Sequence, residues 1–300
     1  MGETRSPDLT VVIPSVNGWD DLQGCLRALA TQSNGAVLEV IVADRVGESV
    51  RAPLRKAFPG VRILEASGTT TIPALRAMAF RAATAEVVGV IEDHVLVPPE
   101  WAARMLEAHG NGAQVVGGAV ENAARGMLVD RAAFFCEYSH CLEPWAGTAD
   151  WLPGNNVTYR KRLLDQFRDV IDRHQWENQL HDALRCAGVL LESRPDIRVG
   201  HCKHYRVAEY VRQRYLYARA YAALRLEGAG VLRRIAWGCA ACALPPVLLS
   251  RIARRVWRDH TRRPDLAAAL PLLALFVTAW AVGEAIGYWC GPGDALSKVC

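Results

Sequence analysis

Two carboxylates and an imidazole directly follow an apolar run. Glu92, Asp93 and His94 come after residues 87–91 (VVGVI), which read as a buried strand. Carboxylate and imidazole groups at the mouth of a strand can hold a divalent cation, and such an ion can neutralise a departing diphosphate as a Lewis acid. We therefore interpret this tripeptide as a candidate metal and phosphate site. A surface turn after the strand is the alternative interpretation.

A second polar group lies at the ends of two other apolar runs. Asp44 ends the run at 40–43, and Pro14, Ser15 and Asn17 lie in the loop that ends the first run of the chain. Loops of this kind lie side by side at the carboxyl edge of a parallel sheet, where Asp44 can accept hydrogen bonds from a base or a ribose. The alternative is that Asp44 is a turn residue that ends a strand.

These side chains need a scaffold, and the apolar pattern of the first 120 residues predicts one. The expected strands are 9–14, 37–43, 61–65, 87–91 and 115–120, and the expected helices are 20–30, 53–58, 72–83 and 98–108. Strands that alternate with helices at this spacing predict an α/β fold with a mostly parallel, Rossmann-like sheet flanked by helices.

The C-terminal quarter is apolar and rich in arginine. Residues 266–290 contain one charged residue, Glu284, over a length sufficient to cross a bilayer, and residues 235–249 form a shorter apolar run that two prolines interrupt. The arginine-rich stretch 251–263 fits a cytoplasmic flank. We therefore expect one transmembrane helix at 266–290 and an interfacial or re-entrant segment at 235–249. Buried core helices are the alternative for both.

Composition narrows the remaining classes of protein. The 300 residues are 51% hydrophobic with a formal net charge of +4, and the arginines gather late in the chain. This placement favours a membrane surface over nucleic acid, because no basic groove interleaved with aromatic residues accompanies it. Nine scattered cysteines predict reduced thiols, and no signal-peptide pattern is seen. We expect a cell-membrane protein whose catalytic part lies on the cytoplasmic side.

Four motifs occur in the order and approximate spacing of the family 2 glycosyltransferases with the GT-A fold. They are residues 10–14 (TVVIP), 39–44 (EVIVAD), 91–94 (IEDH) and 152–160 (LPGNNVTYR). The chain resembles that family over roughly residues 8–225. The resemblance implies an inverting transferase that uses a nucleotide-sugar donor and Mn²⁺ or Mg²⁺. It places a GT-A catalytic domain at 1–225 and membrane-associated helices at 226–300.

The same resemblance implies which residues contact the donor and the metal. It assigns the donor and its nucleotide to Pro14, Ser15, Asn17, Asp44, Arg76, Glu92 and Asp93. The tripeptide 92–94 stands where the family has its D-x-D metal motif, with His94 in place of the usual carboxylate. Histidine is a competent ligand for Mn²⁺. The implied metal ligands are Asp93, His94 and His201, and His204 competes with His201 for that role.

Inversion requires a general base that takes the proton of the attacking hydroxyl group. The family supplies it from an acidic pair that opens a helix, which implies Glu177 here, with Asp182 as the second choice. The alternative for Glu177 is a purely structural carboxylate at a helix N-terminus. The loop of Gly154, Asn155 and Asn156 resembles the one that shapes the sugar and acceptor pocket, and an ordinary turn is its alternative.

The Q-x-x-R-W signature of processive synthases is absent near residue 213, so we expect single transfers. The expected acceptor is lipid-linked or otherwise close to the membrane, as in the building of a cell-envelope glycan. Two alternatives remain: a catalytically impaired nucleotide-binding membrane scaffold, and a sugar nucleotidyltransferase. The second would normally carry a glycine-rich basic loop after the first strand, and the loop at 14–18 has no basic residue.

Overall fold

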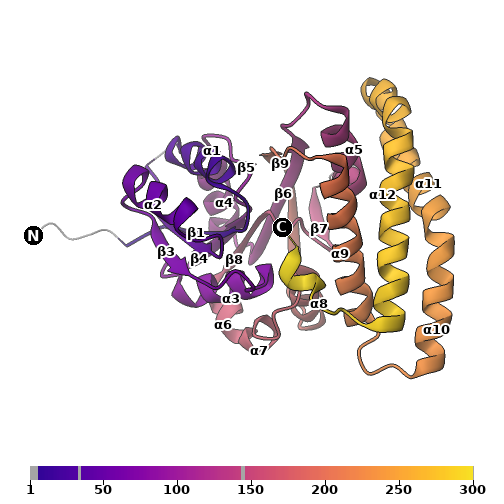
Figure 1. Ribbon diagram of the computed structural model, residues 1–300. Coiled ribbons are helices and arrows are strands. Elements are labelled where there is room, and N and C mark those ends of the chain that lie inside the picture. Colours follow the sequence, from indigo (N-terminus) through magenta and orange to yellow (C-terminus); the bar gives the residue numbers. More distant parts are fainter. Residues whose placement is uncertain (1–5, 33–34, 143–145, 300) are drawn as a thin grey trace, which may run out of the picture. The chain divides into compact units, whose positions relative to one another are not determined.

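The computed structural model of the chain describes residues 6–32, 35–142 and 146–299 (Figure 1). These residues divide into two compact units. The first unit combines the segments 1–123 and 143–202, and the second combines 124–142 and 203–300.

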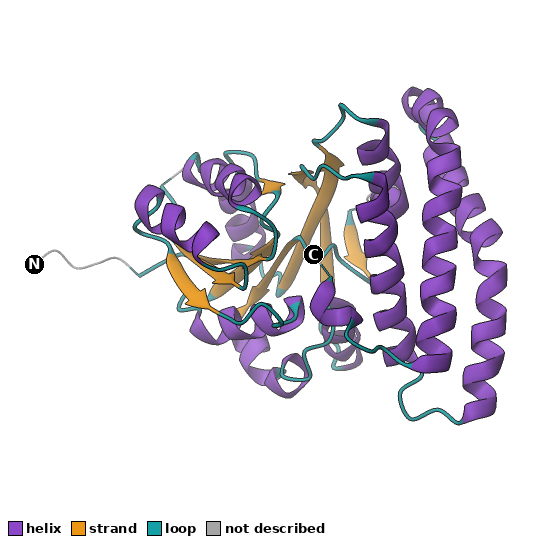
Figure 2. Ribbon diagram, viewed as in Figure 1, coloured by secondary structure: helices purple, strands orange, loops and turns teal. Residues whose placement is uncertain are grey.

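The described part of the first unit contains one mixed sheet of nine strands (Figure 2). The strands are β1 (Leu9–Ser15), β2 (Leu38–Asp44), β3 (Arg62–Glu65), β4 (Val87–Ile91), β5 (Val95–Leu96), β6 (Val115–Asn122), β7 (Gly147–Ala149), β8 (Asn156–Arg160) and β9 (Leu191–His201). Their order is β3-β2-β1-β4-β8-β6-β9-β5, and β7 pairs with β9. Strands β1 to β4 pair in parallel, whereas β8 runs antiparallel between β4 and β6. The predicted α/β class is confirmed.

Helices cover this sheet. They are α1 (Trp19–Ala30), α2 (Glu48–Ala57), α3 (Ile72–Ala82), α4 (Trp101–Gly110), α6 (Lys161–Gln166), α7 (Arg168–Ile171) and α8 (Glu177–Cys186). Helix α3 packs on β1 and β2, and α4 packs on β6 and β9. Every residue of β1 and β4 is buried, as expected for central parallel strands that are covered on both faces.

One predicted helix start was wrong. The sequence pattern placed a helix at 53–58 with Pro53 at its first turn, but α2 begins at Glu48 and contains Pro53 in its interior. Gly47 has a φ of 108° and forms the N-cap, and Val50 and Leu54 bury the same face four residues apart. Burial of this face therefore outweighs the one backbone hydrogen bond that the proline removes.

The second unit is helical. It contains α5 (Leu128–Tyr138), α9 (Val207–Arg225), α10 (Val231–Ala240), α11 (Leu244–Trp257) and α12 (Arg263–Cys290), with short 3₁₀ turns at η1 (Ser139–Cys141), η2 (Ala241–Ala243), η3 (His260–Arg262) and η4 (Ala295–Lys298). Helix α9, which the sequence analysis grouped with the catalytic domain, belongs to this unit by its contacts. The functional boundary at residue 225 stays a prediction.

Small residues allow α9 and α12 to pack closely. A Cβ atom built on Gly283 would lie 2.4 Å from the carbonyl oxygen of Tyr215, and one built on Gly287 would lie 2.4 Å from the carbonyl oxygen of Arg219. Both positions also face alanines of α9, Ala218 and Ala222 respectively. A ladder of small residues at a spacing of four is typical of apolar helices that pack backbone against backbone.

Two helical segments are long and apolar enough to cross a membrane, Val231–Trp257 and His260–Cys290, which is weak evidence for membrane association. The second contains the predicted transmembrane helix. The first is longer than the predicted 235–249 segment, because Pro245 and Pro246 fall in the first turn of α11, where the missing N–H groups would have no helical partner. Which side of the membrane each end faces stays a prediction.

Candidate active site

Three potential metal ligands converge at the end of β4. One ligand atom from each of Glu92, His94 and His201 lies within 4.8 Å of the other two. The Nε2 atoms of the two histidines are 2.9 Å apart, and Nε2 of His94 is 3.4 Å from Oε2 of Glu92. Antiparallel pairing of Val95 with His201 brings together segments more than 100 residues apart. Two imidazole nitrogens and a carboxylate oxygen form a donor set that suits a divalent transition metal.

Asp93 orients His94 rather than joining this group. Oδ1 of Asp93 lies 3.0 Å from Nδ1 of His94. A carboxylate only accepts, so the proton of this bond belongs to Nδ1, and Nε2 of His94 faces His201 and Glu92. A carboxylate behind a ligating histidine is a common arrangement in metal sites, because it sets the tautomer and the ring orientation.

The remaining bonds of Asp93 tie this site to the loop after β1. Oδ2 accepts the backbone N–H groups of Val16 and Asn17, both at 2.9 Å, and Oδ1 accepts from Nδ2 of Asn17 at 2.6 Å. Burial raises the pKa of the Asp93 carboxyl. The bonds from His94 and from these two amides have the opposite and larger effect, so the pKa lies below its usual value. Asp93 is 1% exposed, and Asn17 is held against it.

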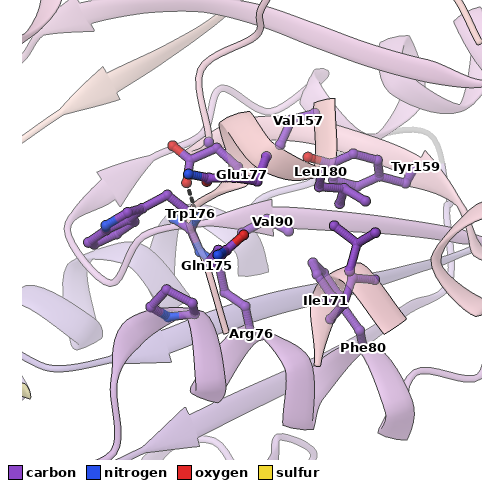
Figure 3. A pocket seen from close by; sticks show the side chains of 14 residues that line it. Arg76, Phe80, Val90, Val157, Tyr159, Ile171, Gln175, Trp176, Glu177 and Leu180 are labelled. Carbon is purple, nitrogen blue, oxygen red and sulfur yellow. Dashed lines mark hydrogen bonds and ion pairs between the residues drawn. The ribbon is translucent and has the colours of Figure 1, made fainter. Parts of the chain in front are cut away.

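Arg76 connects the carboxylate of this group to the predicted base. Its Nη1 lies 2.7 Å from Oε2 of Glu177, and its Nη2 lies 3.7 Å from Oε1 of Glu92. Arg76 is buried, and Glu177 is the first residue of α8. Figure 3 shows Arg76 and Glu177 in a pocket that Gln175 and Trp176 also line. The structure thus brings together the predicted base, the predicted diphosphate contact and the predicted metal region.

The loop between β7 and β8 and the first residue of β8 contribute in three different ways. A Cβ atom on Gly154 would lie 2.4 Å from Oε1 of Glu177, so only glycine leaves room for that carboxylate. Asn155 donates to Oε2 of Glu92 at 3.3 Å. Asn156 differs from its predicted place in a pocket, because its side chain is fully buried and donates to carbonyl oxygens of Ala119 and Ile197. Asn156 therefore links β6 to β9 by hydrogen bonds.

The strand ends that were predicted to contact the nucleoside lie side by side, and their role in binding stays a prediction. Ser15 pairs with Asp44 in the parallel register of β1 and β2, next to Pro14, and the Ser15 hydroxyl group donates to Oδ1 of Asp44 at 2.9 Å. Asp44 is fully buried and also accepts from Arg51 Nε at 2.7 Å and from the amide of Gly47 at 3.0 Å. Arg51 was not among the predicted residues, because its place depends on the early start of α2.

Two alternative residues lie elsewhere. Asp182 is on α8, but its side chain is 68% exposed and lies 3.5 Å from Arg185, so it does not join the group around Glu177. His204 belongs to the second unit, where its Nδ1 lies 2.7 Å from Oδ2 of Asp130. Of the two candidates for the base, Glu177 therefore lies in the group, and of the two candidate histidines, His201 does.

Comparisons with known proteins identify the family and the fold. The model of the family described as glycosyl transferase family 2 matches residues 10–166. The fold is similar to that of the mannosyltransferase PcManGT from Pyrobaculum calidifontis, solved in complex with GDP-Man and Mn²⁺, with a TM-score of 0.55 and 17% identity over 94% of this chain and 88% of that one. No curated protein sequence matches significantly. The chain belongs to glycosyl transferase family 2 and is a glycosyltransferase with a GT-A-like fold.

Proposed function

We propose that this glycosyltransferase transfers a sugar from a nucleotide-sugar donor to an acceptor hydroxyl group with inversion of the anomeric configuration. The observation that carries the proposal is one series of contacts, which runs from His201 through His94, Glu92 and Arg76 to Glu177. Potential metal ligands, a cation for phosphate and a carboxylate base are thus contributed by β9, the β4–β5 turn, α3 and α8. This is the set of groups that an inverting transfer needs.

Glu92, His94 and His201 would hold the metal, with Asp93 behind His94. When bound, a divalent ion supplies positive charge that stabilises the departing nucleoside diphosphate. Imidazole ligands suit transition metals, whereas Mg²⁺ prefers oxygen ligands, so a site with two histidines favours Mn²⁺ over Mg²⁺. The Mn²⁺ in the structurally similar mannosyltransferase supports this choice.

The protein residues divide the reaction between a base and a cation. The acceptor oxygen attacks the anomeric carbon from the face opposite the diphosphate, the bond from that carbon to the diphosphate oxygen breaks, and Glu177 takes the hydroxyl proton. Arg76 contacts Glu177, and a bound diphosphate would compete with that carboxylate for the same guanidinium. If Arg76 binds the phosphate in place of Glu177, the Glu177 carboxylate becomes free to accept the proton.

The choice of donor and acceptor is supported by the similar mannosyltransferase and by the two apolar helical segments. GDP-Man in the similar mannosyltransferase makes GDP-mannose the first donor to test, with the strand-end residues Pro14, Ser15 and Asp44 beside the nucleoside. The two long apolar helical segments favour an acceptor that is lipid-linked or close to the membrane. We place the catalytic unit on the cytoplasmic side, where the product would enter cell-envelope glycan synthesis.

The test is transfer by detergent-solubilised full-length protein. A panel of nucleotide sugars, with GDP-mannose included, is supplied with Mn²⁺, with Mg²⁺ or with a chelator, and lipid-linked sugars with free hydroxyl groups serve as acceptors. The proposal predicts donor consumption that Mn²⁺ supports better than Mg²⁺, and proton NMR of the product should show the inverted anomer. A retained anomer would rule out the role of Glu177, and equal activity in chelator would rule out the metal site.

A further inference from the structure

A cavity of about 430 Å³ lies within the helical second unit. This volume falls in the range of about 300–1,000 Å³ that is usual for small-molecule sites. Four arginines line it, and Glu284 is the one carboxylate among its described lining residues. The arginines are Arg214 and Arg225 on α9 and Arg251 and Arg255 on α11. The lining therefore carries a clear excess of positive charge.

Two of these arginines have carboxylate partners: Nη1 of Arg214 lies 3.8 Å from Oε1 of Glu137, and Arg225 pairs with Glu284. Arg225 donates to Oε2 of Glu284 at 3.3 Å. Arg214 lies 4.1 Å over the ring of Trp280, and its buried Nε has no hydrogen-bond partner among the described residues. A buried donor without a partner is costly unless a ligand or water satisfies it.

Arg251 and Arg255 make no hydrogen bond or ion pair with the described residues. They are four positions apart on α11, so they lie on the same face of that helix. Guanidinium groups match phosphate oxygens with two parallel hydrogen bonds, which makes such a pair suited to a phosphate group.

Part of the lining is apolar. Leu248 and Leu244 line the cavity one and two turns before Arg251 on α11, and Trp237 and Val277 line it from α10 and α12. The wall formed by α11 therefore changes from hydrocarbon to guanidinium along a single helix. A free phosphate would use only one end of such a cavity.

The exposed surface of the same helices points to the source of the ligand. Leu232 is 85% exposed on α10, and Leu275 and Val282 are 43% and 50% exposed on α12. These helices belong to the segments long enough to span a bilayer. We propose that the cavity binds an anionic lipid, with its phosphate at Arg214, Arg251 and Arg255 and its hydrocarbon chain along Leu244 and Leu248.

The experiment measures lipid binding to the full-length protein in a neutral detergent by isothermal titration calorimetry. The probes are dioctanoyl phosphatidic acid, dioctanoyl phosphatidylcholine and inorganic phosphate. Phosphatidic acid should bind more tightly than either of the others. The double variant Arg251→Gln/Arg255→Gln should weaken its binding at least about tenfold, since each arginine near a lipid phosphate contributes several-fold. Circular dichroism of each variant confirms that its helices are intact.

A matched control separates the cavity from general surface charge. Arg254→Gln/Arg258→Gln removes the same charge from the same end of α11, but neither residue lines the cavity, so its affinity should stay within about twofold. A second variant, Leu248→Trp, fills the apolar end and should weaken phosphatidic acid while leaving phosphate binding unchanged. Equal losses in both arginine pairs, or phosphate binding as tight as phosphatidic acid, would overturn the proposal. None of these readouts requires turnover, so failure of the proposed transfer reaction is a separate result.

Discussion

Arg76 in the first unit and the arginine pair of α11 in the second differ in their carboxylate partners. At the end of β4, Arg76 is flanked by Glu92 and Glu177, so carboxylates of the protein balance this cation. In the helical unit, Arg251 and Arg255 line a cavity without a carboxylate partner among the described residues. A balanced site can exchange partners during a reaction, whereas an unbalanced one favours a ligand that brings the missing charge. This contrast suits catalysis in the first unit and anion binding in the second.

The largest effect should come from removing the base. Glu177→Gln keeps the shape of the side chain but removes its proton acceptor, so kcat should fall about 10²- to 10⁴-fold, while the donor Kd should not rise, because Glu177 no longer competes for Arg76. Steady-state kinetics and nucleotide-sugar titration measure the two quantities. Asp182→Asn, on the same helix but exposed, is the control and should stay near full activity. Loss of activity in Asp182→Asn alone would transfer the base role to that residue.

Removing a metal ligand should have the next largest effect. His201→Ala should raise the Mn²⁺ concentration for half-maximal activity by about 100-fold or more, because even partners behind a ligand usually contribute 10- to 100-fold in affinity. Electron paramagnetic resonance of Mn²⁺ gives the affinity without turnover. His204→Ala removes the nearby histidine of the second unit and should change neither value. An unaltered Mn²⁺ affinity in His201→Ala would remove the metal role of this histidine.

Packing in the helical unit offers a stability test that leaves the charges unchanged. Gly287→Leu forces side-chain atoms against the carbonyl oxygen of Arg219, and such overpacking typically costs about 1–3 kcal/mol. Thermal unfolding in detergent should show a lower Tm for Gly287→Leu. The control Ala268→Leu adds the same bulk at an exposed position of α12 and should not lower the Tm. Equal Tm values would mean that α9 and α12 are not in close contact.

A smaller effect should follow pH in the first unit. Burial lowers the pKa of His109 and of His181 from 6.5 to about 4, so the unfolded chain binds protons more readily than the folded one between these values. The contribution of these histidines to the free energy of unfolding should therefore be fully present above about pH 6.5. It should decline as the pH falls toward 4, by about 1–2 kcal/mol per histidine at pH 5. Calorimetry at pH 7.5 and 5 measures the change. His109→Asn should reduce the pH dependence, and an unchanged slope would contradict the assignment.

Much of the sheet and of the site could be predicted, because strand ends and apolar runs are local features. The runs at 87–91 and 40–43 correctly indicated β4 and β2, and the parallel register placed Ser15 beside Asp44. The antiparallel insertion of β8 could not be predicted, since strand order depends on contacts between distant segments. The start of α2 was missed because a proline signal was given more weight than the burial of Val50 and Leu54.

The sequence by itself determined the residue types available for chemistry, the alternation of strands and helices, and the apolar character of the C-terminal quarter, because each is encoded within short windows. Tertiary structure alone decided which of these residues meet. The pairing of β5 with β9 brings His201, and not His204, to His94. Asp93 contacts Nδ1 of His94, on the side of the ring away from the atom that faces His201. Tertiary structure also gathered arginines from α9 and α11 around one cavity. Such encounters join positions far apart in the chain, and their geometry follows from packing, which no local pattern records.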